Sequence, residues 1–265
     1  AMMQKIVIDL SKKYVAYLSQ LSIINRVFKY ALHLDIIQTN PVDRIIRPKQ
    51  QKPRKEKIAL TKEELNQFLT LAKKDARPVL YTAWHTLAYT GLRRGELLGL
   101  EWSDIDFTNN IITVNKTLAL NTDKKVVVQT PKSKSSIRNI SIDEQTANIL
   151  KRWKIKQKEK FIMIGTRVKK HQPCFTEEVS NSYLYLNFMN ANLKRICKKN
   201  GFKQIKVHGF RHTHCSLLFE SGFTIQEVQD RLGHSDLKTT MSIYAHVTEK
   251  QKEEVGKKFA RYVNF

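Results

Sequence analysis

Long apolar runs, paired cysteines and acidic residues are all scarce in this sequence of 265 residues. No hydrophobic run approaches the roughly 18 residues that a membrane-spanning helix needs, and the first residues do not resemble a secretory signal. The 3 cysteines are far apart and form no C-x-x-C pair, which favours a reducing, cytoplasmic compartment over a disulfide-stabilised secreted fold. Sequence motifs typical of metal, nucleotide or serine-protease sites are also missing.

The shortage of acidic residues is the strongest compositional signal. Asp and Glu total 24, whereas Lys and Arg total 47, and the formal net charge is +23. This excess of positive charge predicts a polyanionic partner, either nucleic acid or an anionic membrane surface. Because nothing in the sequence indicates membrane insertion, we expect a nucleic-acid partner and no membrane.

Residues 1–47 predict a helical unit that is separate from the rest of the chain. Apolar residues recur there at i, i+3, i+4, i+7 and i+8 and form one helical face: Ile24, Val27, Phe28, Ala31 and Leu32. Asn40-Pro41 is expected to end this unit, which is short for an independent domain and is interpreted as a fragment of one.

Residues 48–60 predict an extended basic linker, since prolines and dense like charge disfavour a packed element. Four of its cations are expected to lie along nucleic-acid phosphates: Lys49, Lys52, Arg54 and Lys55. The alternative is a solvated tether that contacts nothing.

A second domain is expected to begin at Thr61, where residues 61–64 form a Thr-Lys-Glu-Glu capping box. Pro78 suits the first turn of the next helix, and Gly91 is expected to end that helix. Arg93 and Glu96 then follow at i, i+3. They form either an ordinary surface ion pair at the start of a helix or part of a functional site.

Residues 110–142 alternate with β-branched side chains, which predicts a small antiparallel sheet. Just before it, Asp104 and Asp106 are expected to make turn hydrogen bonds in preference to a metal site. A turn at 131–133 would place Lys132 at a hairpin tip, where its amine could reach a phosphate or a leaving oxygen; an exposed, solubilising lysine is the alternative. With helices predicted from about 144 and over roughly 181–200, the expected fold class is mainly α with a small antiparallel β-sheet (α+β).

The richest collection of chemical groups lies in the C-terminal fifth. If 208–221 is a helix, His208 and Arg211 are one turn apart and can contact the same small anion, which the planar guanidinium suits well. His214 falls among apolar neighbours and is expected to be a core histidine. Further along the chain come His234 and Tyr244.

Two alternatives for this stretch remain open at this stage. His208, His212 and Cys215 have ligand-like spacing for zinc, but Arg211 would project its charge onto the same face, so a metal site is disfavoured. Residues 224–247 predict a helix, a turn at Gly233 and a second helix, a pattern that also suits a helix-turn-helix motif in a major groove.

Five motifs resemble, in order and spacing, those of the tyrosine recombinases, or phage-type integrases. They are Thr90-Gly-Leu-Arg93-Arg-Gly-Glu96-Leu, Thr130-Pro-Lys132-Ser-Lys134, His208-Gly-Phe-Arg211-His212-Thr, Leu232-Gly-His234-Ser-Asp and Tyr244-Ala-His246-Val. Each motif is weak alone, but the ordered set is specific. The resemblance covers about residues 61–248 as the catalytic domain, and residues 1–47 resemble the C-terminal part of that family's helical core-binding domain, which clamps DNA.

The resemblance implies a role for each site residue. Tyr244 would be the nucleophile that attacks a DNA phosphodiester and forms a 3′-phosphotyrosyl link. Arg93 and Arg211 would bind the non-bridging oxygens. His208 would assist proton transfer and His234 would hydrogen-bond the phosphate. The remaining residues complete the set: Lys132, or Lys134 in its place, as the acid for the leaving 5′-oxygen, Glu96 and His212 as supports, and Lys134 and Arg138 as further DNA contacts.

The function implied is a site-specific recombinase that integrates or excises a mobile element without metal, ATP or another cofactor. Its partners would be double-stranded DNA at attachment or core sites, three further copies of itself in a tetramer, and an accessory DNA-bending or excision factor. The tail over residues 249–265 would dock on a neighbouring subunit, and the protein would work in the bacterial cytoplasm, associated with the nucleoid. The rival functions are a type IB topoisomerase-like enzyme and a non-catalytic helix-turn-helix regulator.

Overall fold

The computed structural model describes residues 2–49, 59–123, 125–130, 136–177, 179–233, 240–241 and 243–245. The chain divides into two compact units, Ala1–Glu56 and Lys57–Phe265. Most of the predicted linker, including Lys52, Arg54 and Lys55, lies outside the described residues, as do Lys132, Lys134, His234 and the tail over 249–265.

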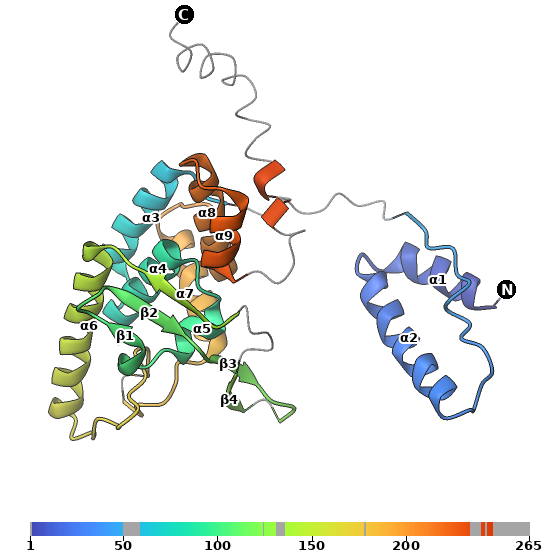
Figure 1. Cartoon of the computed structure of the whole chain (residues 1–265), viewed down its shortest axis with the longest axis horizontal. Coiled ribbons are helices and arrows are strands. Elements are labelled where there is room, and N and C mark those ends of the chain that lie inside the picture. The colour runs from blue at the N-terminus through green and yellow to red at the C-terminus, as the bar shows by residue number, and fades with distance from the viewer. Residues whose placement is uncertain are drawn as a thin grey trace, which may run out of the picture. The chain divides into compact units, whose positions relative to one another are not determined.

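The first unit consists of α1 (Met2–Lys13), α2 (Tyr17–His33) and the segment that follows them (Figure 1). Its core contains Val7, Tyr17, Leu21 and Val42. The expected apolar face of α2 was partly wrong, because Val27 is 63% exposed. The unit also extends past Asn40-Pro41, since the Tyr17 hydroxyl donates a hydrogen bond to the carbonyl of Pro48 (2.5 Å). Ile24 and Phe28 of the predicted face pack against this core, but the buried residues of α2, Tyr17 and Leu21, lie nearer its start.

The second unit is built around one buried helix, α4. It contains α3 (Lys62–Asp75), α4 (Pro78–Thr90), α5 (Arg94–Gly99), α6 (Glu144–Met163), α7 (Leu186–Lys199), α8 (Val207–Glu220), α9 (Ile225–Leu232) and a 3₁₀ turn, η1 (Trp102–Asp104). Ten of the 13 residues of α4 are buried, and α3, α6 and α8 pack against it (Figure 1). A helix that is apolar on all sides must be enclosed in this way.

Several predicted helix boundaries are confirmed. Thr61 and Glu64 form the reciprocal capping box of α3, Pro78 occupies the first turn of α4, and Gly91 ends α4 in the left-handed conformation, with φ 65°. The helix expected over 181–200 begins later, at Leu186.

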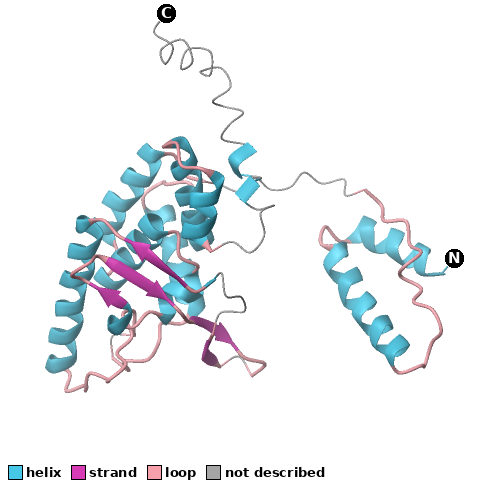
Figure 2. Ribbon diagram, viewed as in Figure 1, coloured by secondary structure: helices cyan, strands magenta, loops and turns pink. Residues whose placement is uncertain are grey.

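The strands form two small sheets, where the sequence predicted one. One sheet has the order β1-β2-β5, and the other is the hairpin β3-β4, all of them antiparallel (Figure 2). The strands are β1 (Ile105–Asp106), β2 (Ile111–Val114), β3 (Thr117–Leu120), β4 (Val126–Gln129) and β5 (Arg138–Ser141). Ile112 pairs with Ile140 in the register of β2 and β5, and both side chains are buried. The mainly helical α+β class is thus as expected.

The C-terminal helices carry a smaller core of their own, formed by Cys215, Phe219, Val228, Leu232 and Ile243. The capping box of α9, Thr224 with Glu227, fixes where that helix begins. Within the part of the chain that the structure describes, no helix is both long and apolar enough to cross a membrane.

Candidate functional site

The site is built where α4 ends and α5 begins. After the left-handed turn at Gly91, Arg93 serves as the N-cap of α5, and its backbone N–H donates to Oε2 of Glu96 (2.9 Å). The Arg93 guanidinium donates from Nη1 to Oε1 of Glu96 (2.6 Å) and from Nη2 to the carbonyl of Gly233 (2.9 Å). Glu96 is 3% exposed. The Arg93 side chain is 37% exposed, so a partly accessible guanidinium is anchored on a buried carboxylate, which differs from an ordinary pair of two exposed side chains.

Glu96 is shared between two arginines. Nη2 of Arg138, which projects from β5, lies 2.9 Å from Oε2 of Glu96. Burial alone would raise the pKa of Glu96, but the hydrogen bond and charge of Arg138, with those of Arg93, outweigh burial and leave the pKa lowered. The carboxylate is thus held ionised beside both guanidiniums.

Arg211 reaches the same place from α8. Its Nη1 donates to the carbonyl of Gly91 and its Nη2 to the carbonyl of Leu232, both at 2.7 Å, and the residue is 2% exposed. Burial, and then the positive charge of Arg93, lower the pKa of Arg211 to about 9. The guanidinium remains the charged form at neutral pH, but the protein holds it there against a cost of desolvation.

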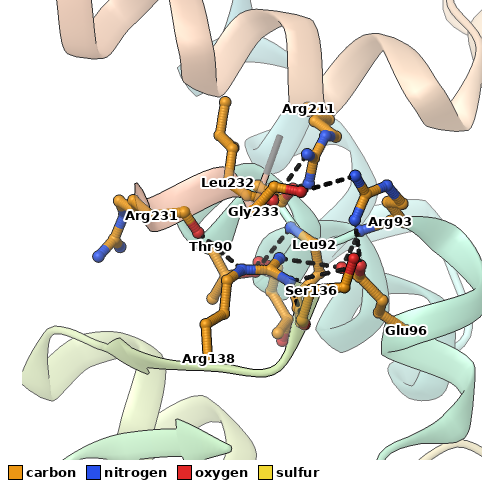
Figure 3. A network of polar contacts seen from close by, with 12 residues as sticks. Thr90, Leu92, Arg93, Glu96, Ser136, Arg138, Arg211, Arg231, Leu232 and Gly233 are labelled. Carbon is orange, nitrogen blue, oxygen red and sulfur yellow. Dashed lines mark hydrogen bonds and ion pairs between the residues drawn. The ribbon is translucent and has the colours of Figure 1, made fainter. Parts of the chain in front are cut away.

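The C-terminal end of α9 collects these arginines. Its last carbonyls, at residues 231, 232 and 233, accept hydrogen bonds from Arg138 Nε (2.8 Å), Arg211 Nη2 (2.7 Å) and Arg93 Nη2 (2.9 Å) respectively (Figure 3). Carbonyls at a helix C-terminus have no partner within the helix and carry the negative end of its dipole, so they stabilise cations. Three guanidiniums from separate elements are brought together by one helix end.

A neighbouring group of hydrogen bonds joins α8 and α9 to the end of α4. Nδ1 of His214 lies 2.8 Å from the carbonyl of Ala88, so it must be the protonated nitrogen, and Nε2 accepts from Arg231 Nε (3.0 Å). Arg231 also donates to the carbonyl of Tyr89 (3.1 Å). Burial, and then the charge of Arg231, lower the pKa of His214 to about 4. The expectation of a core histidine is confirmed by its burial, since His214 is 8% exposed.

The two other predicted histidines of α8, His208 and His212, lie in its first two turns. His208 is exposed and His212 half-buried, and their rings meet edge to face with centroids 4.6 Å apart. Next to them is a cavity of about 660 Å³, whose lining includes Arg93, Arg94, Lys206 and His208. The positive charges of Arg93, Arg94 and Lys206 make this cavity suitable for an anionic ligand.

Tyr244 is half-buried, and its ring packs edge to face on Phe219 with centroids 5.2 Å apart. Phe219 lies eight positions after Arg211 on α8, about 12 Å along the helix axis. The tyrosine ring therefore packs on α8, the helix that carries Arg211.

The arginine network has a strong excess of positive charge. Among the described residues that form it, Arg93 and Arg138 pair with the carboxylate of Glu96, and Arg211 bonds the same helix end, so three cations stand against one acid (Figure 3). Oriented guanidiniums with this imbalance are suited to bind a phosphate and to stabilise added negative charge on it.

Sequence reasoning misplaced Arg138 and missed Arg231. Arg138 was expected to contact DNA, but its side chain is 7% exposed and is directed at Glu96 and the end of α9. A signal for this was present, because strand alternation places residue 138 on the same face as Ile140, which is buried. Arg231 had no comparable signal, since its partners come from distant segments.

The remaining predictions concern metal ligands and the linker. Among the described residues there is no cluster of three His, Cys, Asp or Glu side chains that could hold a metal ion. Cys215, the third residue of the zinc alternative, is fully buried in the small C-terminal core. Lys49 is exposed in the first unit.

The model of the phage integrase family matches residues 59–251. The chain is 34% identical over 236 residues to the ICEBs1 integrase of Bacillus subtilis, which covers 89% of this chain and 62% of that protein. It is 27% identical over 234 residues to the transposase from transposon Tn916 of Enterococcus faecalis, covering 83% and 56% respectively. The chain thus spans less than two thirds of the length of these relatives.

Solved structures with the same fold include the Tn1549 transposon integrase in complex with transposon right end DNA. The TM-score is 0.78 at 23% identity, with 96% of this chain and 84% of that one covered. A lambda integrase dimer bound to a core site gives a TM-score of 0.60 at 17% identity, covering 92% and 62%. At these identities the likeness establishes the fold.

Proposed function

Because this chain belongs to the phage integrase family, we propose that it acts as a site-specific DNA recombinase that integrates or excises a mobile element. The observation that carries the proposal is the convergence of Arg93 and Arg211 on neighbouring carbonyls at the end of α9. The two arginines come from separate elements, and the surrounding network has more cations than anions. This is the arrangement needed to neutralise the two non-bridging oxygens of a phosphodiester.

The proposed reaction is a transesterification. The Tyr244 oxygen attacks phosphorus, a bond forms between them, and the bond to the 5′-oxygen breaks, which leaves a 3′-phosphotyrosyl link and a free 5′-hydroxyl. His208 takes part in moving the tyrosine proton, and Lys132 or Lys134 supplies a proton to the leaving oxygen. The second step reverses these changes with a new 5′-hydroxyl. Because the phosphotyrosine conserves the phosphodiester bond, rejoining needs no ATP.

The supporting residues follow from their contacts. Glu96 fixes the guanidinium of Arg93, and the ring of His212 packs against that of His208. His234 directly follows Gly233, whose carbonyl receives Arg93, so we assign it a hydrogen bond to the phosphate.

The partners proposed are double-stranded DNA at attachment or core sites and three further copies of the protein, with an accessory DNA-bending or excision factor. The first unit, with Lys49 and the basic residues after it, would clamp the duplex, and residues 61–248 would form the catalytic domain. The tail over 249–265 would dock on the adjacent subunit. A protein with this activity would work on DNA in the bacterial cytoplasm, associated with the nucleoid.

The test is trapping of the covalent intermediate. The full-length protein is incubated with a nicked suicide DNA that carries its attachment site, so that the cleaved fragment diffuses away and the adduct accumulates. We expect an adduct with the wild type and none with Tyr244→Phe, which should still bind DNA. No adduct from the wild type on its proper site would contradict the proposal and favour a DNA-binding regulator. Adduct without strand exchange between two sites would favour a type IB topoisomerase-like activity.

A further inference from the structure

Arg138 makes two contacts that join β5 to other elements of the site. Its Nη2 pairs with Oε2 of Glu96 (2.9 Å), and its Nε donates to the carbonyl of Arg231 (2.8 Å). The side chain is 7% exposed, so it is not presented to a ligand outside the protein. It instead ties strand β5 to α5 through Glu96, and to α9 through the helix end.

The first contact controls how Glu96 holds Arg93. Oε2 accepts from the Arg93 backbone N–H and from Nη2 of Arg138 (both 2.9 Å), and Oε1 accepts a longer bond from Nη1 of Arg138 (3.4 Å). The Arg93 guanidinium therefore bonds Glu96 through Oε1 alone (2.6 Å). Its other terminal nitrogen, Nη2, is thereby directed to the carbonyl of Gly233. Without Arg138, a buried carboxylate with one remaining cation would draw Arg93 into a two-pronged pair and away from the end of α9.

The second contact holds the end of α9. Arg138 binds the carbonyl of residue 231, and the next two carbonyls bind Arg211 and Arg93 (Figure 3). The chain leaves the helix at Gly233 in the left-handed conformation, with φ 64°. Arg138 therefore fixes to β5 the same helix end that both proposed phosphate ligands bind.

We propose that Arg138 is a positioning residue of the phosphate site: it holds Arg93 and the end of α9 in the reactive arrangement and does not itself touch the DNA. This inference rests on the proposed recombinase function, which the wild-type adduct assay tests separately. It replaces the expectation that Arg138 is a DNA contact.

The experiment measures the rate of Tyr244–DNA adduct formation at saturating suicide DNA, together with DNA affinity, for Arg138→Gln. We expect the rate to fall by about 30-fold or more, since a displacement on the order of 1 Å in a reacting group can cost about 100-fold, while the dissociation constant changes less than about threefold.

Arg138→Lys should recover part of the rate, because lysine supplies charge to Glu96 but cannot also reach the carbonyl of Arg231. Arg152→Gln is the matched control, since Arg152 is exposed and bonds only within its own helix; its rate should equal that of the wild type.

Glu96→Gln provides a second, independent check. If Arg138 acts through Glu96, Arg138→Gln should slow the reaction much less in the Glu96→Gln background than in the wild type. If Arg138→Gln lowers the rate equally in the wild-type and Glu96→Gln backgrounds, Arg138 does not act through Glu96.

Other results would overturn the inference. A wild-type rate for folded Arg138→Gln would show that the residue positions nothing, and a loss of affinity in proportion to the loss of rate would show a direct DNA contact. If Arg138→Gln does not fold, Arg138→Lys decides by the same two criteria. Absence of adduct from both the wild type and Arg152→Gln would instead refute the proposed function.

Discussion

The second unit contains two buried polar clusters that differ in their charge balance. In the first, Nζ of Lys116 lies 2.6 Å and 2.8 Å from the two carboxylate oxygens of Asp104 and 3.6 Å from Glu101, so one cation faces two acids. In the second, Arg93 and Arg138 pair with Glu96, and Arg211 bonds the same helix end, so three cations face one acid. Both clusters are fixed by several hydrogen bonds, but the first lies within residues 101–116, whereas the second joins Arg93 to Gly233 across 140 positions.

The difference separates a cluster that stabilises the fold from one that is prepared for a ligand. The lysine of the first cluster is matched within the protein, and its side chain is 17% exposed. The second cluster concentrates like charges, which costs free energy in the folded protein and is expected where a site awaits an anion. Three variants test this distinction, from the largest expected effect to the smallest.

Removing Arg211 should have the largest effect on activity. In Arg211→Ala the phosphate would lose a buried ligand, and adduct formation should fall by about 1000-fold. DNA affinity should fall less than about tenfold, because binding is spread over many cations. A suicide-substrate assay and a binding titration measure the two effects, with circular dichroism to establish folding. An equal loss of rate and affinity would make Arg211 a simple backbone anchor.

Removing Lys116 should give the opposite result. Lys116→Met leaves Asp104 and Glu101 without their cation inside the protein, so the free energy of unfolding should fall by about 2 kcal/mol. Adduct formation per folded molecule should match that of the wild type. Urea unfolding and the adduct assay together provide the measurement. A rate loss larger than the loss of folded protein would remove the distinction between the clusters.

Lowering the pH should protonate His214 and so place an additional positive charge beside the arginine cluster. The pKa of His214 is lowered from 6.5 to about 4, so the unfolded chain binds the proton more tightly than the folded one. Stability is therefore fully retained above pH 6.5 and is lost as the pH falls from 6.5 towards 4; at pH 5.5 the loss should be about 1.4 kcal/mol.

The comparison is urea unfolding of the wild type and His214→Gln at pH 7.5 and pH 5.5. The wild type should lose about 1.4 kcal/mol more than the variant between these conditions. His85, whose burial also lowers its pKa to about 4, contributes to both proteins and cancels in the difference. Equal losses would show that His214 is not kept neutral by the fold.

Local sequence signals predicted much of the second unit. The capping box at Thr61, the proline that starts α4 and the glycine that ends it are each set by neighbours within a few residues, so the sequence indicates them directly. The placement of His214 in the core followed from helical periodicity alone. In contrast, the inner face of α2 was misassigned because Val27 satisfies the periodicity and yet is exposed.

Long-range contacts account for what the sequence could not predict. Arg138 reaches Glu96 across 42 positions, and Arg211 reaches the carbonyl of Gly91 across 120. No local pattern encodes such partners, nor the use of one helix end to gather three guanidiniums. The motif resemblance nominated Arg93 and Arg211 as a pair, but the carboxylate and carbonyls that hold them were visible only in the folded chain. The roles of Tyr244, His234 and Lys132 stay predictions.

The central claim is that the excess charge of the arginine cluster is matched to the charge of a phosphate. It is tested most directly with suicide DNA in which one non-bridging oxygen of the scissile phosphate is replaced by a methyl group, so that the phosphate charge is removed. Adduct formation is measured for the wild type and Arg211→Ala on both substrates. The account predicts that the defect of about 1000-fold on ordinary DNA shrinks to less than about tenfold on the neutral substrate. A defect of the same size on both substrates would contradict it.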